Sequence, residues 1–268
     1  MLTRESFASR FKRPLFGMVH LAPLPGAPLF GGSLDAVIDA ALADAHALAE
    51  GGCDGMVFEN FGDRPFFKES VPPETVAAMT RVIAEVTGEV ALPFGVNVLR
   101  NDAISSIAIA AATGAAFVRV NVHTGAMLTD QGIIEGRAAE TLRRRAVLAP
   151  HVLIFADHMV KHATPLGEID EEQAARDLRQ RGLADAVIVS GRETGAAPDA
   201  ARFRRVRAVV EGPLLVGSGL TEGNADAFAE ADGAIAGTSI KRDGRVDTPV
   251  DAARVARLAA AFRRRGGR

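Results

Sequence analysis

The segment from Gly212 to Gly244, GPLLVGSGLTEGNADAFAEADGAIAGTSIKRDG, contains two short apolar runs that each end in small, hydrogen-bonding residues. Residues 214–216 precede Gly-Ser-Gly at 217–219, and residues 234–236 precede Gly-Thr-Ser at 237–239. Glycine lets a backbone approach a ligand closely, and the N–H groups of such turns can face an anion. Phosphate-binding loops after strands seven and eight of a (β/α)8 barrel have this pattern. We therefore predict that six strand–helix units precede the segment.

The remainder of the chain supplies these units. Apolar runs typical of strands lie at residues 15–20, 55–59, 93–97, 117–121, 152–157 and 186–189. Segments typical of helices lie at 34–50, 73–86, 103–113, 137–149, 170–181, 199–210, 224–230 and 250–264. Strands that alternate with helices predict a parallel sheet with helical cover, and about 250 residues suit one closed barrel. A doubly wound open sheet is the alternative, but the glycine-rich turn expected after its first strand is missing.

We therefore predict an α/β protein in which residues 1–268 form a single (β/α)8 TIM-barrel domain. Residues 1–14 are charged and are predicted to be an N-terminal extension, and residues 265–268 a frayed basic tail. The formal net charge of −2 provides no basic field for nucleic acid. No apolar run approaches the length of a membrane span, and the N-terminus lacks a signal-peptide core. A lone cysteine, Cys53, fits a reducing compartment, so we expect a cytoplasmic protein.

Polar residues recur at the predicted carboxyl ends of the strands, where the chemistry of such barrels takes place. They are His20, Glu59 with Asn60, Asn97, Asn121 with His123, Asp157 with His158, and Ser190. Because alternate residues of a strand share a face, Asn97, Asn121 and Asp157 are predicted to converge on one pocket. Glu59 joins them from the second strand. Arg119 would lie one layer deeper, where its buried charge needs Glu59 or Asp157 as a partner.

The predicted catalytic residues are Glu59, Asp157, Asn97, Asn121, Lys161 and His158. Carboxylates in a closed apolar mouth can exchange protons near neutrality, which makes Glu59 and Asp157 the acid and base candidates. Lys161 can bind an anion, act as a base or form a Schiff base. Its place in a loop, where water would keep it protonated, disfavours the Schiff base. Any strand-end polar residue taken alone more often caps a loop.

We predict no cofactor, and a divalent metal is the alternative. His158 and His162 have the i,i+4 spacing of a metal-binding helix face, and Glu59 and Asp157 would complete the site. A metal-dependent hydrolase or lyase would use Glu59, Asp157 and His158, with His20 as a further candidate ligand. The interpretation without a metal is a loop whose histidines are solvated.

The predicted anion cradle combines the small residues that follow strands six, seven and eight. Its members are Gly191, Gly217, Ser218, Gly219, Gly237, Thr238 and Ser239. Arg192 either adds to this region or only turns the chain. Lys241 and Arg242 either reach the anion or are surface charges.

Several loop motifs occur in an order that resembles the BtpA/SgcQ family. They include GMVHLAPLPGAP at 17–28, DGMVFENFGDRPF at 54–66, VRVNVHTGAMLTDQGIIEG at 118–136 and DHMVKHATPL at 157–166. The resemblance covers about residues 16–247 and implies a phosphate-binding (β/α)8 barrel. One branch of that family is named for photosystem I biogenesis at thylakoid membranes, and another is tied to carbohydrate-related gene contexts. The resemblance therefore implies no single reaction.

These observations predict a homo-oligomeric enzyme that acts on a small phosphorylated, sugar-like metabolite by isomerase, epimerase or aldolase-type acid–base chemistry. One alternative is an accessory factor for the biogenesis of a membrane complex such as photosystem I. Another is a metal-dependent hydrolase or lyase. We expect neither a nucleic-acid partner nor an integral membrane segment.

Overall fold

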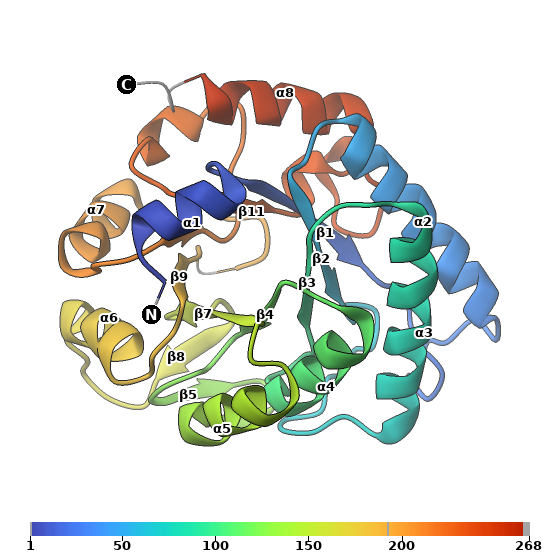
Figure 1. The fold of residues 1–268 in the computed structure, drawn as a ribbon, viewed down its shortest axis with the longest axis horizontal. Helices are drawn as coiled ribbons and strands as arrows, with labels where there is room; N and C mark the ends of the chain where they lie inside the picture. Colours follow the sequence, from blue (N-terminus) through green and yellow to red (C-terminus); the bar gives the residue numbers. More distant parts are fainter. Residues whose placement is uncertain (1, 192, 265–268) are drawn as a thin grey trace.

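The predicted barrel is confirmed by the computed structural model, which describes residues 2–191 and 193–264. Its strands close in the order β1-β11-β10-β9-β7-β4-β3-β2, and every neighbouring pair is parallel (Figure 1). The strands are β1 (Leu15–His20), β2 (Gly55–Glu59), β3 (Phe94–Asn97), β4 (Phe117–Val120), β7 (Leu153–His158), β9 (Ala186–Val189), β10 (Leu214–Val216) and β11 (Gly233–Ala236). The register pairs Glu59 with both His20 and Asn97, so these strand ends lie at one level.

A ring of helices surrounds the barrel (Figure 1). These are α2 (Leu34–Glu50), α3 (Pro73–Glu89), α4 (Ala103–Thr113), α5 (Ala138–Leu148), α6 (Glu171–Gln180), α7 (Ala200–Val209) and α8 (Ala252–Arg263). Strands covered on both faces read as continuous apolar runs, as the sequence does here. The predicted helix at 224–230 is only a 3-10 turn, η1 (Ala225–Phe228), and two more such turns follow β11, namely η2 (Thr238–Ile240) and η3 (Arg242–Gly244). The predicted basic tail at 265–268 lies outside the described residues.

The predicted N-terminal extension contains a helix, α1 (Arg4–Phe11), which closes the amino-terminal end of the barrel. Thr3 caps the helix, since its hydroxyl accepts a hydrogen bond from the N–H of Ser6 at 3.1 Å. Phe7 and Phe11 then enter the aromatic cluster inside the barrel, where the Phe7 ring lies 6.0 Å from that of Phe155. Because this segment is rich in charged residues, the sequence prediction did not assign its two aromatic side chains to the core.

A three-stranded antiparallel sheet, absent from the sequence prediction, stands beside the mouth of the barrel. It consists of β6 (Gly132–Glu135), β5 (Ala126–Thr129) and β8 (Ala163–Pro165), in that order. One face packs Met127 and Ile134 against Val122 and Val160. The sheet joins the loop after β4 to the loop after β7, and it thereby positions the segment that carries Lys161.

We expect Phe7→Ala to lower the free energy of unfolding by about 3–5 kcal/mol, because it removes a fully buried ring from the barrel floor. Urea denaturation of the purified chain measures the change. Val147→Ala is the control, since Val147 is 78% exposed and its truncation should change stability by no more than about 0.5 kcal/mol. Equal effects of the two substitutions would show that α1 does not seal the barrel.

Candidate active site at the barrel mouth

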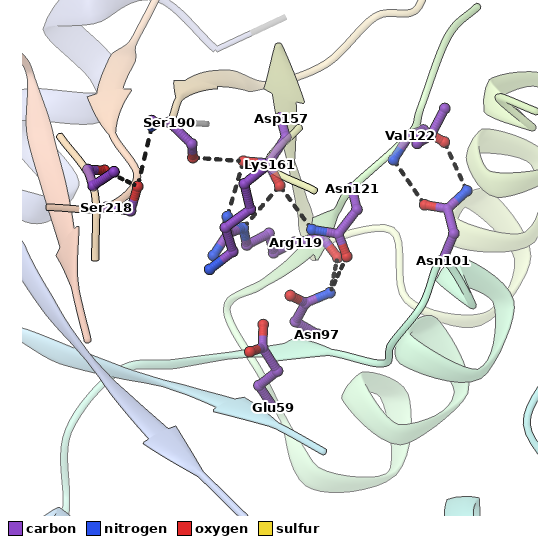
Figure 2. A network of polar contacts seen from close by, with 12 residues as sticks. Glu59, Asn97, Asn101, Arg119, Asn121, Val122, Asp157, Lys161, Ser190 and Ser218 are labelled. Carbon is purple, nitrogen blue, oxygen red and sulfur yellow. Dashed lines mark hydrogen bonds and ion pairs between the residues drawn. The ribbon is translucent and has the colours of Figure 1, made fainter. Parts of the chain in front are cut away.

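A buried hydrogen-bond network centred on Asp157 joins the ends of β3, β4, β7 and β9 (Figure 2). The Arg119 guanidinium donates to both Asp157 oxygens, from Nε at 3.0 Å and from Nη2 at 2.9 Å. Asn121 Nδ2 donates to Asp157 Oδ2 at 2.8 Å, and the Ser190 hydroxyl lies 3.3 Å from Oδ1. Asn97 Nδ2 in turn donates to Asn121 Oδ1 at 3.1 Å. The predicted convergence of Asn97, Asn121 and Asp157 is therefore present, and Arg119 pairs with Asp157.

The Arg119–Asp157 ion pair is almost completely buried, with side-chain exposures of 2% and 0%. Burial opposes the charge of Arg119, but the charge and hydrogen bonds of Asp157 together with the charge of Glu59 outweigh this effect and raise the pKa of the guanidinium. Both Asp157 oxygens accept a hydrogen bond from the guanidinium, and Oδ2 also accepts one from the Asn121 amide. The Asp157 carboxylate is therefore held as a fixed anion. This arrangement suits Asp157 to positioning its neighbours.

Glu59 is the contrasting carboxylate of the site. Its side chain is 3% exposed, and the His20 ring places Nε2 3.7 Å from Oε1. Within residues 2–191 and 193–264 its carboxylate accepts no side-chain hydrogen bond. Glu59 and Lys161 line the same cavity, and Figure 2 shows Glu59 below Asn97 and the hydrogen-bond network. A buried carboxylate with free lone pairs can accept a proton from a ligand.

His20 was predicted only as a strand-end polar residue and a possible metal ligand, yet it links Glu59 to the loop after β11. Its ring stacks on Phe61, with 4.6 Å between the centroids. Burial, reinforced by Lys241, Lys161 and Arg119, places the pKa of His20 well below its usual value, so the ring is neutral. A Cβ at Gly237 would lie 3.2 Å from His20 Cε1, which shows how closely the two approach.

Lys161 is partly buried, in contrast to the solvated loop position that we predicted. Burial lowers the pKa of its amine, an effect that nearby Glu59 partly opposes. The backbone oxygen of Lys161 accepts a hydrogen bond from Arg100 Nη2 at 2.6 Å, which fixes the loop over the mouth. Arg100, only 5% exposed, was missed in the sequence. Its position three residues after the end of β3 was the available signal.

The prediction that His158 belongs to the catalytic group, or to a metal site with Glu59 and Asp157, is not supported by the geometry. Asp157 faces the barrel interior, so the alternation of β7 turns His158 outward, where it lines a pocket of about 350 Å³ beside Leu178 of α6. The predicted helical face shared by His158 and His162 does not form, because β7 ends at His158 and His162 has a φ of 54°. Among the described residues, no group of three or more His, Cys, Asp and Glu side chains could hold a metal ion.

The opening between these groups is a cavity of about 480 Å³. Its lining includes Glu59, Asn121, Lys161, Arg64, Arg100 and Asp130. The volume suits a small metabolite.

The predicted cradle divides into two parts. Ser218 accepts a hydrogen bond from the Gly191 N–H at 3.2 Å and donates to the Ala196 oxygen at 2.9 Å. A Cβ at Gly219 would meet the Ala197 nitrogen at 2.0 Å. Here the small residues, with Gly217 beside Ser190, make room for the loop after β9.

Thr238 and Ser239 form the other part of the cradle and line an open pocket of about 340 Å³ with Gly195 and Arg254. Neither of the two readings of Lys241 is correct, since it is buried and its Nζ lies 3.0 Å from Asp44 Oδ2. Arg242 is exposed. Arg192 lies outside the described residues.

Comparison with known proteins supports the resemblance seen in the motifs. The model of the BtpA family matches residues 11–264. The chain belongs to the BtpA family. It is 47% identical to "Photosystem I biogenesis protein BtpA" of Synechocystis sp., over 90% of this chain and 85% of the relative. It is 35% identical to "Putative sgc region protein SgcQ" of Escherichia coli, over 92% and 93%, respectively. An uncharacterized protein of Thermococcus kodakarensis is 48% identical, over 92% and 94%.

Solved structures show that this BtpA-family chain shares its fold with barrel enzymes. Thiamine phosphate pyrophosphorylase from Pyrococcus furiosus superposes with a TM-score of 0.58 at 14% identity, covering 95% of this chain and 97% of that one. Orotidine 5′-phosphate decarboxylase from Pyrococcus horikoshii gives 0.56 at 13% identity, covering 93% and 99%. Identities this low establish the architecture alone. In the part of the chain that the structure describes, no helix is both long and apolar enough to span a membrane.

We expect Arg119→Met to lower the free energy of unfolding of this BtpA-family protein by about 3–5 kcal/mol, because it leaves the Asp157 charge buried without a partner. Urea denaturation measures the loss. The double variant Arg119→Met with Asp157→Leu should recover part of it, since both charges are then gone. Arg81→Ala breaks an exposed pair with Asp35 and should cost no more than about 1 kcal/mol. A single-variant loss as small as this control would contradict the assigned role.

The stability of the chain should also fall on acidification through His158. Burial lowers the pKa of His158 from 6.5 to about 4, so below pH 6.5 the unfolded chain binds a proton that the folded chain does not. Stability from this group is complete above pH 6.5 and is lost as the pH falls toward 4, by on the order of 3 kcal/mol. Urea denaturation of the wild type and His158→Gln between pH 7.5 and 4.5 should show a flatter profile for the variant. Parallel profiles would contradict the buried neutral state.

Proposed function

We propose that this protein is an enzyme that acts on a small phosphorylated, sugar-like metabolite by acid–base chemistry of the isomerase or lyase type. The observation that carries the proposal is the contrast between two buried carboxylates at one barrel mouth. Asp157 is held as an anion by Arg119, whereas Glu59 faces a cavity of about 480 Å³ with its lone pairs free. A protein without chemistry to perform does not need a desolvated carboxylate directed at a cavity.

Glu59 is the proposed general base. Its carboxylate takes a proton from the carbon next to a substrate carbonyl, and the electron pair of the broken C–H bond moves to the carbonyl oxygen. Lys161 lies across the cavity and stabilises that oxygen by donating a hydrogen bond from its amine. Return of the proton to the former carbonyl carbon, with transfer of the α-hydroxyl proton to the former carbonyl oxygen, gives isomerisation. Return of the proton to the opposite face of the original carbon gives epimerisation. In the lyase reaction Glu59 instead takes the proton of a hydroxyl group on the carbon β to the carbonyl. The bond between the α and β carbons then breaks, an aldehyde leaves, and the electron pair of that bond forms an enolate whose oxygen Lys161 stabilises.

Asn97 and Asn121 are proposed to orient the substrate. Asn97 Nδ2 is used inside the protein, but Asn97 Oδ1 is buried without a partner among the described residues. A buried acceptor of this kind costs stability unless a donor reaches it. A hydroxyl group of a sugar-like substrate can supply that donor. Because Asn121 is fixed by Asp157, the amide pair is preorganised for this contact.

The phosphate is proposed to lie near Thr238 and Ser239, in the pocket that Arg254 also lines. Both hydroxyls are partly exposed, and Arg254 forms no ion pair within residues 2–191 and 193–264. Hydroxyl and guanidinium groups suit phosphate oxygens. Several solved barrels with the same fold are named for phosphorylated compounds, which supports this assignment by analogy of fold.

A role as an accessory factor in the biogenesis of a membrane complex is the alternative, and it rests on the name of the Synechocystis relative. Such a role requires a binding surface, whereas the enzyme requires the Glu59 carboxylate. The experiment below separates the two.

A thermal-shift screen of phosphorylated metabolites should identify a ligand that stabilises the protein, by about 2.7 kcal/mol at one hundred times its Kd. Glu59→Gln should keep this stabilisation and lower turnover of the ligand by about 10²- to 10⁴-fold, because the amide cannot take a proton. Glu135→Gln, on the exposed edge of β6, is the matched control and should behave as wild type. Full turnover by Glu59→Gln would refute its role as the base, and a screen without any ligand would favour the accessory role.

A further inference from the structure

Three cations from different loops line the mouth cavity and have no anionic partner there. Arg64 follows β2, Arg100 follows β3 and Lys161 follows β7, and all three line the same cavity of about 480 Å³. Among the described residues, none of the three lies within 4.0 Å of a carboxylate oxygen. Arg119, by contrast, is paired, since its Nε and Nη2 donate to the two oxygens of Asp157. Arg100 is buried and Lys161 is half-buried, whereas Arg64 is exposed at the rim of the cavity. A buried or half-buried cation without a partner is costly, so Arg100 and Lys161 favour an anion that comes from outside.

Arg100 is the best-defined member of this group. Its backbone N–H donates to the Phe67 oxygen at 3.0 Å, and its Nη2 donates to the Lys161 oxygen at 2.6 Å. A guanidinium has five N–H donors, and the described residues use only this one. The side chain is fixed and 5% exposed, so its remaining donors are preorganised at the cavity wall. Such a group binds a carboxylate through two parallel hydrogen bonds.

Arg64 is also held in place, by an aromatic stack. Its guanidinium carbon lies 5.1 Å from the centroid of the Phe61 ring, and the same ring stacks on His20. The stack brings Arg64 to the cavity from the side of β1 and β2, whereas Arg100 approaches from β3. An anion between them would meet two guanidinium groups.

The charge balance of the cavity limits the charge of that anion. Glu59 and Asp130 also line it, so that its walls carry three cations and two carboxylates. His162 adds no charge at neutral pH, because burial and the neighbouring Lys161 and Arg100 lower its pKa. One positive charge is left. A single carboxylate balances it, whereas a second phosphate would bring nearly two negative charges.

We propose that the mouth cavity binds a carboxylate group between Arg64 and Arg100, so that the substrate is a phosphorylated sugar acid or hydroxy acid. This inference rests on the proposed function and specifies its substrate class. The carboxylate occupies the cavity, and the phosphate lies in the pocket of Thr238 and Ser239. The two volumes are adjacent, because Thr194 lines the first and the next residue, Gly195, lines the second.

Isothermal titration with 3-phosphoglycerate and glycerol 3-phosphate tests the carboxylate site, since the two differ only in a carboxylate that replaces a hydroxymethyl group. The wild type should bind 3-phosphoglycerate at least tenfold more tightly. Arg100→Gln should remove this preference while keeping the affinity for glycerol 3-phosphate, and Arg100→Lys should restore part of it. Arg81→Gln, whose guanidinium lies on the outer surface of α3, should retain the full preference. Circular dichroism checks that each variant is folded.

The remaining outcomes separate this inference from the proposed function. Equal affinities of the wild type for the two phosphates would overturn the carboxylate site and leave the proposed phosphate substrate in place. Tighter binding of fructose 1,6-bisphosphate than of 3-phosphoglycerate would replace the carboxylate by a second phosphate. Equal affinities of the wild type for glycerate and 3-phosphoglycerate would support the carboxylate site and contradict a phosphorylated substrate. Failure of all four compounds to bind would overturn both.

Discussion

The ion pair between Arg119 and Asp157 is the interaction on which the mouth of this barrel depends. It joins β4 to β7 where both side chains are shielded from water, and neither charge is tolerable there without the other. Once the pair is formed, Asp157 has one orientation, and it fixes Asn121, which fixes Asn97. The polar floor of the cavity is therefore one connected unit, which gives the strand ends a defined geometry before any ligand arrives.

This arrangement divides the charged residues of the mouth into two layers. In the lower layer, the donors of Arg119 and Asn121 meet the oxygens of Asp157, and Asn97 Oδ1 is the acceptor left without a partner among the described residues. The upper layer, which contains Glu59, Lys161 and Arg100, is not satisfied within the described chain. Such a division suits a site in which the protein holds the charges of its own framework in place and leaves the outer groups for a ligand. It also separates Glu59 and Asp157 into different roles, although they have the same chemistry and similar burial.

The loops position the side chains of this upper layer, and contacts at the two ends of the barrel in turn position the loops. At the amino-terminal end, Phe7 and Phe11 of α1 fill the barrel and free the opposite end for polar groups. At the carboxyl-terminal end, the sheet of β5, β6 and β8 supports the segment of Lys161, and Arg100 ties that segment down. The glycines after β9 and β10 serve the packing of neighbouring loops. Membership of the BtpA family accounts for the order of these loop motifs along the chain.

The sequence by itself determined the barrel and the convergence of Asn97, Asn121 and Asp157, because both follow from local periodicity. Apolar runs alternate with helical segments, and side chains alternate along each strand. The same rule, had it been applied one residue further, would have excluded His158 from the mouth.

Only the tertiary structure decided between Glu59 and Asp157 as the partner of Arg119. It also buried Lys241 against Asp44, nearly two hundred positions away, and placed α1 in the barrel. These contacts join residues that are distant in the chain, and their geometry depends on closure of the barrel, which no local pattern records.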